Sequence, residues 1–402
     1  MLTATKDVVL PTTVVGSWPR PVWYTENLGA RPFSAAMNDL AFREQYLDAV
    51  ATVISDQEYA GLDILTNGDL HLDADFAGRS WHNYSLQRMA GLSEHELEAT
   101  DPRWGKPNGT WGNEIMSGWR FPGVVGRIGP GIPFEYGKIW RTAQARATRP
   151  VKMGANTADV LGSVVNVHTD LYDDDRRQLM WDMADVINAE LRELVAAGCS
   201  VVQIEDPQLH YAALFGQDDS MVDFLVDLFN HEVQGLEEAE VWIHTCWGNA
   251  GSQGAPGDRR RYDASIEHYL HRLNADVLQI ESKDSGHEPR ALFARYKGQR
   301  LPMKLAVGML SHRTLQVESV EEVAADIRLW LQYIDAEQLC LASDCGFGRQ
   351  GVPRPIALYK AAALAQGANV VRRELGVEQH EVPAADPLRQ IDPSPVEVGY
   401  FS

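Results

Sequence analysis

The order of hydrophobic patterns along the chain constrains its fold more than any other feature. Eight short, mostly apolar runs, several of them rich in β-branched residues, alternate with longer segments in which apolar residues recur at helical spacing. Strands and helices that alternate in this way form parallel sheets, because each helix returns the chain to the same edge of the sheet. The predicted strands span 12–17, 62–68, 151–155, 201–205, 241–245, 277–281, 304–308 and 339–343.

Eight parallel strands joined by helices predict an α/β fold of the (β/α)8 TIM barrel type, and an open, doubly wound sheet is the alternative. A chain of 402 residues can form one such barrel with additions, so we expect a single catalytic domain over 1–402. The predicted helices fill most gaps between strands, at about 34–60, 175–197, 219–236, 262–274, 288–296, 319–334 and 354–371.

Two segments depart from this alternation. The segment after the second predicted strand, about residues 69–150, is too long for a simple crossover to the next strand. It indicates a long, tryptophan-rich insertion, in which 123–128 would form one arm of a hairpin. Loops that follow barrel strands lie on the catalytic face, so this insertion is placed to wall or cover a site. Alternatively, its tryptophans only pack it onto the barrel. The polar, proline-containing residues from about 372 to 402 indicate a surface extension or an arm of a homo-oligomer.

The charge balance excludes several classes of partner. The chain has 36 Lys plus Arg against 56 Asp plus Glu, and a formal charge of -20 repels nucleic acid and anionic lipid. No apolar run approaches the ~20 residues that cross a bilayer, and the first residues lack the apolar core of a signal peptide. We therefore expect a cytoplasmic protein with no nucleic acid or membrane partner. Its 4 scattered cysteines indicate free thiols.

Metal-binding residue types gather at the ends of three predicted strands. His244 and Cys246 are two residues apart, so on a strand both side chains point to the same side. Glu281 ends the sixth predicted strand and Cys345 follows the eighth. One imidazole, two thiolates and one carboxylate form a tetrahedral set that suits zinc. A lone His-x-Cys pair is more often structural, but together these four residues predict a Zn²⁺ site at the catalytic rim.

The ligand set also indicates a reaction class. Zinc with two thiolate ligands and a carboxylate is a poor source of hydroxide, but it can bind and deprotonate an incoming thiol whose free pKa is ~8.5. A zinc-bound thiolate attacks alkyl carbon, which predicts S-alkyl transfer. A closed structural zinc site is the alternative. The chain has no GxxxxGK[ST], no GxGxxG after its first strand, no GxSxG and no HExxH, so nucleotide hydrolysis and dinucleotide redox chemistry have no support.

Several ordered motifs resemble the zinc-bearing barrel of cobalamin-independent methionine synthases and their short single-barrel relatives. HTC, QIES and SDCG resemble the zinc-ligand motifs of this family. TTVVGSWPRP and VVQIEDP resemble segments that bind the substrate amino acid, and VGMLSHRT resembles the stretch with a catalytic histidine that handles the proton at the methyl-donor leaving group. The resemblance implies catalytic His312, substrate-binding Ser17, Asp69, Glu205 and Asp206, and metal ligands His244, Cys246, Glu281 and Cys345.

The resemblance implies a zinc-dependent S-methyltransferase that binds homocysteine as a zinc thiolate and forms methionine without cobalamin. The chain departs from the family in three ways: it has one barrel where the long form has two, Asp69 stands where a glutamate is usual, and the acidic order Glu205-Asp206 is reversed. The methyl donor, whether a folate, a corrinoid or another molecule, is left open.

Two other functions are compatible with these motifs. One is a thiol alkyltransferase of the epoxyalkane:coenzyme M type, whose sulfonate would need a cation. The candidates near strand ends are Arg20, Lys283, Arg313 and Arg349. The other is a non-catalytic zinc scaffold, or a ligand-binding barrel related to uroporphyrinogen decarboxylase.

Overall fold

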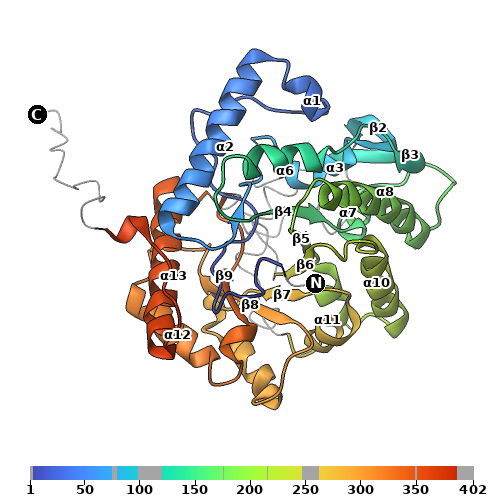
Figure 1. Cartoon of the computed structure of the whole chain (residues 1–402). Coiled ribbons are helices and arrows are strands. Elements are labelled where there is room, and N and C mark those ends of the chain that lie inside the picture. The colour runs from blue at the N-terminus through green and yellow to red at the C-terminus, as the bar shows by residue number, and fades with distance from the viewer. Residues whose placement is uncertain are drawn as a thin grey trace, which may run out of the picture.

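The protein is built around one curled parallel sheet. The computed structural model describes residues 3–74, 79–97, 120–174, 176–214, 216–246, 262–348 and 351–386. Its main sheet has seven strands in the order β1-β4-β5-β6-β7-β8-β9, with helices around the outside (Figure 1). These strands are β1 (Leu65–Thr66), β4 (Val151–Asn156), β5 (Val201–Glu205), β6 (Glu240–Thr245), β7 (Val277–Ile280), β8 (Lys304–Leu310) and β9 (Leu339–Ser343).

The segment 12–17 closes this sheet into a barrel without being a regular strand. Thr12 forms a parallel bridge with Leu341 of β9, and Ser17 forms one with Gly68, just after β1. Pro11 cannot donate a backbone hydrogen bond, and the φ of Gly16 is +20°, so the segment bends between its two bridges. The predicted eight-membered barrel is therefore confirmed, with its first strand reduced to isolated bridges.

Helices cover the outer face of the barrel. Asp39 caps α2 by accepting hydrogen bonds from Ala41 N and Phe42 N, and for this reason the helix predicted over 34–60 divides into two. At the other end of the chain, α13 ends at Gly376 in the left-handed conformation, beyond the predicted end at 371. The helices of this layer are α1 (Phe33–Ala36), α2 (Leu40–Ala60), α7 (Ala158–Val164), α8 (Arg177–Ala196), α9 (Gln208–Leu214), α10 (Asp219–Glu232), α11 (Ile266–Arg272), α12 (Val320–Trp330) and α13 (Arg354–Leu375). The helix predicted over 288–296 is a 3-10 helix, η4 (Glu288–Tyr296).

The chain between β1 and β4 adds a small unit beside the barrel. It contains α3 (Ser80–Leu86), the antiparallel pair β2 (Met89–Leu97) and β3 (Phe121–Pro130), and α6 (Tyr136–Gln144). Residues 123–128 lie in β3, as one arm of a hairpin. Asn156 Nδ2, at the end of β4, donates to Trp81 O at 2.8 Å, which places α3 at the catalytic rim. Trp140 Nε1 donates to Val151 O, so this tryptophan packs α6 against the barrel. That this unit between β1 and β4 covers the site as a lid stays a prediction.

The opposite end of the barrel is closed by the first residues of the chain. Thr3 N and Thr5 N donate to Glu240 Oε1 at 2.5 and 2.7 Å, and Lys304 Nζ donates to Thr5 O at 2.5 Å. An apolar layer above them fills the barrel interior, and its buried members are Ile64, Val201, Trp242, Val277, Ala306 and Cys340. Access to the interior is therefore confined to the carboxyl ends of the strands.

In the described part of the chain, no helix has both the length and the apolar character needed to cross a membrane.

Replacing Lys152 with methionine is expected to stabilise the protein. Lys152 is buried inside the barrel, its Nζ lies 4.7 Å from the centre of the Trp242 ring, and it has no hydrogen-bond partner among the described residues. Burial lowers the pKa of Lys152 to about 7, below its unfolded value of about 10.4. Below pH 7 the free-energy cost of burying the charged lysine is present in full. This cost shrinks as the pH rises toward 10.4, because the lysine of the folded protein is then neutral.

We expect Lys152→Met to raise the free energy of unfolding at pH 7 by about 1–3 kcal/mol, and by less at pH 9.5. Urea denaturation at both pH values measures this difference. The exposed Lys297→Met is the control, with no pH-dependent gain. An equal gain at both pH values would show that charge burial is not the cause.

Candidate metal centre and substrate site

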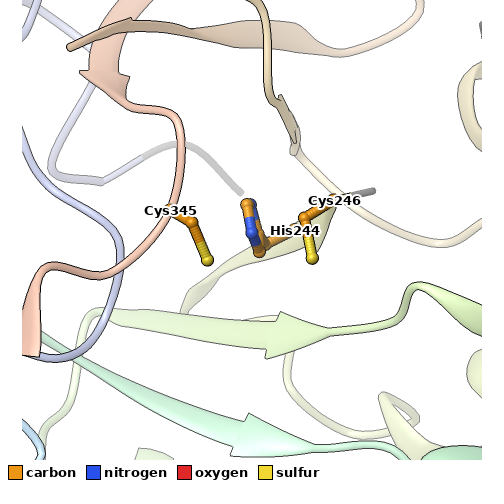
Figure 2. A group of neighbouring side chains, drawn as sticks. All are labelled: His244, Cys246 and Cys345. Atoms are coloured by element: carbon orange, nitrogen blue, oxygen red, sulfur yellow. The ribbon is translucent and has the colours of Figure 1, made fainter. Parts of the chain in front are cut away.

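Three of the predicted metal ligands converge at the carboxyl ends of the barrel strands. His244 lies in β6, Cys246 follows this strand directly, and Cys345 follows β9. One ligand atom from each lies within 4.8 Å of the others, and all three residues are buried. In Figure 2 the imidazole of His244 lies between the two cysteine side chains. Parallel pairing of β6 with β5 and β7 fixes the position of His244 opposite Glu205 and Gln279.

This donor set fits zinc. Imidazole nitrogen and thiol sulfur are donor atoms that zinc prefers. In a tetrahedral zinc site these three donor atoms would be about 3.5 Å from one another, which is compatible with the observed separations of up to 4.8 Å. The two remaining cysteines do not compete for this role. Burial raises the pKa of Cys199 and of Cys340 to about 12, so both stay protonated thiols at neutral pH. Cys199 also donates to Val201 O.

Glu281, the fourth predicted ligand, lies beside the group of three. It directly follows β7 (Val277–Ile280) and is fully buried. Its Oε2 is 3.3 Å from Arg313 Nη2, and its Oε1 is 4.0 Å from His312 Nε2. Burial raises the pKa of Glu281, and the adjacent Arg313 opposes this shift. The carboxylate of Glu281 thus lies beside the cation of Arg313 and close enough to Cys345 to interact with it electrostatically.

His312 belongs to a second polar group at the same rim. Its Nδ1 is 3.9 Å from Asp284 Oδ2, and ligand atoms of these residues and Asp344 lie within 4.8 Å of one another. The carboxylate of Asp344 accepts hydrogen bonds at 2.7–2.9 Å from the backbone of 282–284. Burial and the charge of Asp284 raise the pKa of Asp344 to about 7. A Cβ at Gly308 would lie 1.8 Å from Asp344 Oδ1, so only glycine leaves room for this carboxylate. Sequence reasoning missed Asp284, whose only signal is its position three residues after Glu281.

Two carboxylates converge on the bend at Gly16. A Cβ at Gly16 would lie 2.9 Å from Asp69 Oδ2 and 3.3 Å from Glu205 Oε1, so both groups approach the same backbone atom. Asp69 has a positive φ of 54°, a strained conformation that often marks a functional site. Ser17 is buried beside them, and its Oγ has no hydrogen-bond partner among the described residues. This arrangement suits a ligand that carries an ammonium group.

Asp206 has a different environment from Glu205. Neighbouring residues at a strand end point to opposite sides, and Asp206 Oδ1 accepts from Gln208 N and Leu209 N at the start of α9. Its carboxyl group is also hydrogen-bonded to that of Asp159. Burial and the charge of Asp159 raise the pKa of Asp206 well above its usual range. In the structure Asp206 therefore caps the start of α9. Its contact with the substrate stays a prediction.

The sequence also matches a family model, "Cobalamin-independent synthase, Catalytic domain", over residues 140–366. This match spans more than half of the chain. The chain belongs to the cobalamin-independent synthase family. The matched range includes Glu205, His312 and all four predicted metal ligands, whereas Ser17 and Asp69 precede it.

Curated relatives of this cobalamin-independent synthase match it over nearly their whole length. The methionine synthase of Sulfurisphaera tokodaii is 26% identical over 383 residues, which cover 94% of this chain and 98% of that protein. The methionine synthase of Sulfolobus acidocaldarius is 27% identical over 367 residues, which cover 91% of this chain and 94% of that protein.

Among solved structures, a B12-independent methionine synthase from Shewanella sp. W3-18-1, in complex with selenomethionine, has a TM-score of 0.72. It is 23% identical, and the match covers 92% of this chain and 99% of that one. At this identity the likeness shows a shared fold, in agreement with the barrel of this cobalamin-independent synthase.

Proposed function

We propose that this protein methylates the sulfur of homocysteine to form methionine without cobalamin, with Zn²⁺ held by His244, Cys246, Glu281 and Cys345. The observation that carries the proposal is the buried His/Cys/Cys group at the strand ends, within the range matched by the family model. The names of the curated relatives, methionine synthases that match over nearly their full length, support the same substrate and product. The methyl donor is left open, and the cytoplasmic location and homo-oligomerisation stay predictions.

Each group of residues has a part in this reaction. When bound, zinc supplies the positive charge that keeps a coordinated thiol deprotonated at neutral pH. Asp69 and Glu205 bind the ammonium group of the amino acid, because they place two negative charges at one point in a buried site. His312 handles the proton at the leaving group of the methyl donor, and the carboxylate of Asp284 lies 3.9 Å from its Nδ1.

The cations of the site favour an amino acid thiol over a sulfonate such as coenzyme M. Arg20 donates to the carbonyls of Tyr24 and Leu72, and it lies against the Tyr24 ring. Lys283 is paired with two carboxylates on α12, and Arg313 is paired with two at the rim. Each of these three predicted sulfonate partners is already engaged. The fourth, Arg349, lies outside the described residues.

Zinc-edge X-ray absorption with added thiols tests the proposal. We expect the purified protein to contain one zinc, and homocysteine to replace one nitrogen or oxygen ligand with sulfur. Mercaptobutyrate, which matches homocysteine without its amino group, should bind about 100-fold more weakly, because the carboxylates then lack a partner. Coenzyme M is the second control. If coenzyme M alone changed the ligand shell, the epoxide-type function would be favoured. If neither thiol changed it, the zinc would be structural and the proposal wrong.

A further inference from the structure

Arg313 is a largely buried cation that no part of the proposed reaction uses. Its side chain is only 14% exposed, and it follows His312 directly at the rim of the barrel. Its Nη2 lies 3.3 Å from Glu281 Oε2, and its Nε lies 3.1 Å from Asp284 Oδ2. One guanidinium therefore contacts two carboxylates: that of the predicted metal ligand Glu281, and that of Asp284 beside His312.

The position of Glu281 indicates what this cation does. Its carboxylate is fully buried, and the other three predicted ligands meet one another without it. The Oε1 atom has no hydrogen-bond partner among the described residues, so only one of its two oxygens is satisfied, by Arg313. A buried ionised carboxylate needs hydrogen-bond donors, a cation or a metal to offset the loss of its hydration. His312 Nε2 is 4.0 Å from Oε1, and the nearer places where the charge of Glu281 can be compensated are the metal ion and Arg313.

We propose that Arg313 is a positioning residue that receives the carboxylate of Glu281 when a substrate thiol takes the fourth ligand place. This inference rests on the proposed function. In this exchange His244, Cys246 and Cys345 would continue to hold the ion, the substrate sulfur would take the place of the Glu281 oxygen, and the thiol proton would go to water. One anionic ligand replaces another, and the displaced carboxylate moves onto a cation already beside it. Arg313 thereby determines how readily the thiol binds.

The test compares thiol binding in zinc-loaded Arg313→Met, Arg313→Lys and wild type. Without a cation, Glu281 should stay on the metal. Arg313→Met is then expected to keep its zinc and bind homocysteine at least tenfold more weakly, with its nitrogen or oxygen ligand retained in the zinc-edge spectrum. Arg313→Lys, which preserves the charge, should recover part of the affinity. Adding Glu281→Ala to Arg313→Met should restore thiol binding, because no carboxylate then needs to be displaced.

Lys283→Met is the matched control, since Lys283 is a nearby ion-paired cation that contacts Glu322 and Asp326 instead of Glu281. It should leave the thiol-induced change in the zinc spectrum intact, and thermal melting of each variant checks folding. If wild type and Arg313→Met exchange the ligand with equal thiol affinity, the inference is wrong and the proposed function stands. If wild type shows no exchange, the proposed function itself fails.

Discussion

Replacing Cys345 with alanine is expected to remove zinc from the protein and to abolish methyl transfer. Cys345 lies after β9, whereas His244 and Cys246 lie at β6, so it supplies the donor from the far side of the site. Its loss leaves two neighbouring donors from one strand end and the displaceable Glu281. Changes to groups that merely support a metal ligand cost about 10–100-fold in affinity, and the loss of a thiolate ligand should exceed this range. Competition with a chromogenic zinc chelator measures the affinity, and elemental analysis measures the zinc content.

Cys340→Ala is the matched control for this change. Cys340 is also a buried cysteine of β9, but its side chain packs in the apolar layer inside the barrel, away from the metal group. We expect this control to lose stability, by about 1–2 kcal/mol for a small cavity, and to keep its zinc and its activity. Equal zinc affinity in Cys345→Ala and wild type would mean that the thiol is not a ligand. Loss of zinc in both variants would point to a general effect on folding.

The parallel barrel was predictable because its evidence is local and repeated. Short apolar runs separated by helical patterns recur along the chain, and β4 to β9 lie within a few residues of the predicted bounds. The first two predicted strands were the exceptions, and of 62–68 only Leu65–Thr66 forms a strand, β1. Residues 12–17 have the composition of a strand, but Pro11 and Gly16 limit pairing to isolated bridges at Thr12 and Ser17. Likewise, 34–60 has one continuous helical pattern, and the cap formed by Asp39 divides it.

The candidate site was predictable only for side chains whose direction is determined by their place at the end of a strand. The spacing of His244 and Cys246 on one strand, and the common rim of a parallel barrel, suffice to place these two near Cys345. The partners of long side chains are not determined in this way. Arg313 was a candidate for binding a sulfonate, and in the structure it pairs with Glu281 and Asp284 instead. Such pairs depend on side-chain rotamers and on the charge balance of the whole site, which no local pattern contains.

Glu205→Gln is expected to weaken homocysteine binding by about 100-fold, whereas Asp206→Asn should change it less than about threefold. Removing one partner of a buried charge pair costs about 2–5 kcal/mol, and each 1.4 kcal/mol is tenfold in affinity. Glu205 approaches Asp69 at Gly16, where the ammonium group would bind. The high pKa of Asp206 makes asparagine a close mimic of its protonated form, and the amide oxygen can still accept from the backbone of α9.

Calorimetric titration of each variant with homocysteine and with mercaptobutyrate separates a contact with the ammonium group from a change in the fold. Glu205→Gln should weaken only the binding of homocysteine, because mercaptobutyrate has no ammonium group to lose. A variant that damaged the barrel would weaken both ligands equally. If Asp206→Asn instead gave the selective loss, the ammonium group would bind on the α9 side of β5. Because the side chains at 205 and 206 point in opposite directions, we expect the selective loss from only one of the two variants.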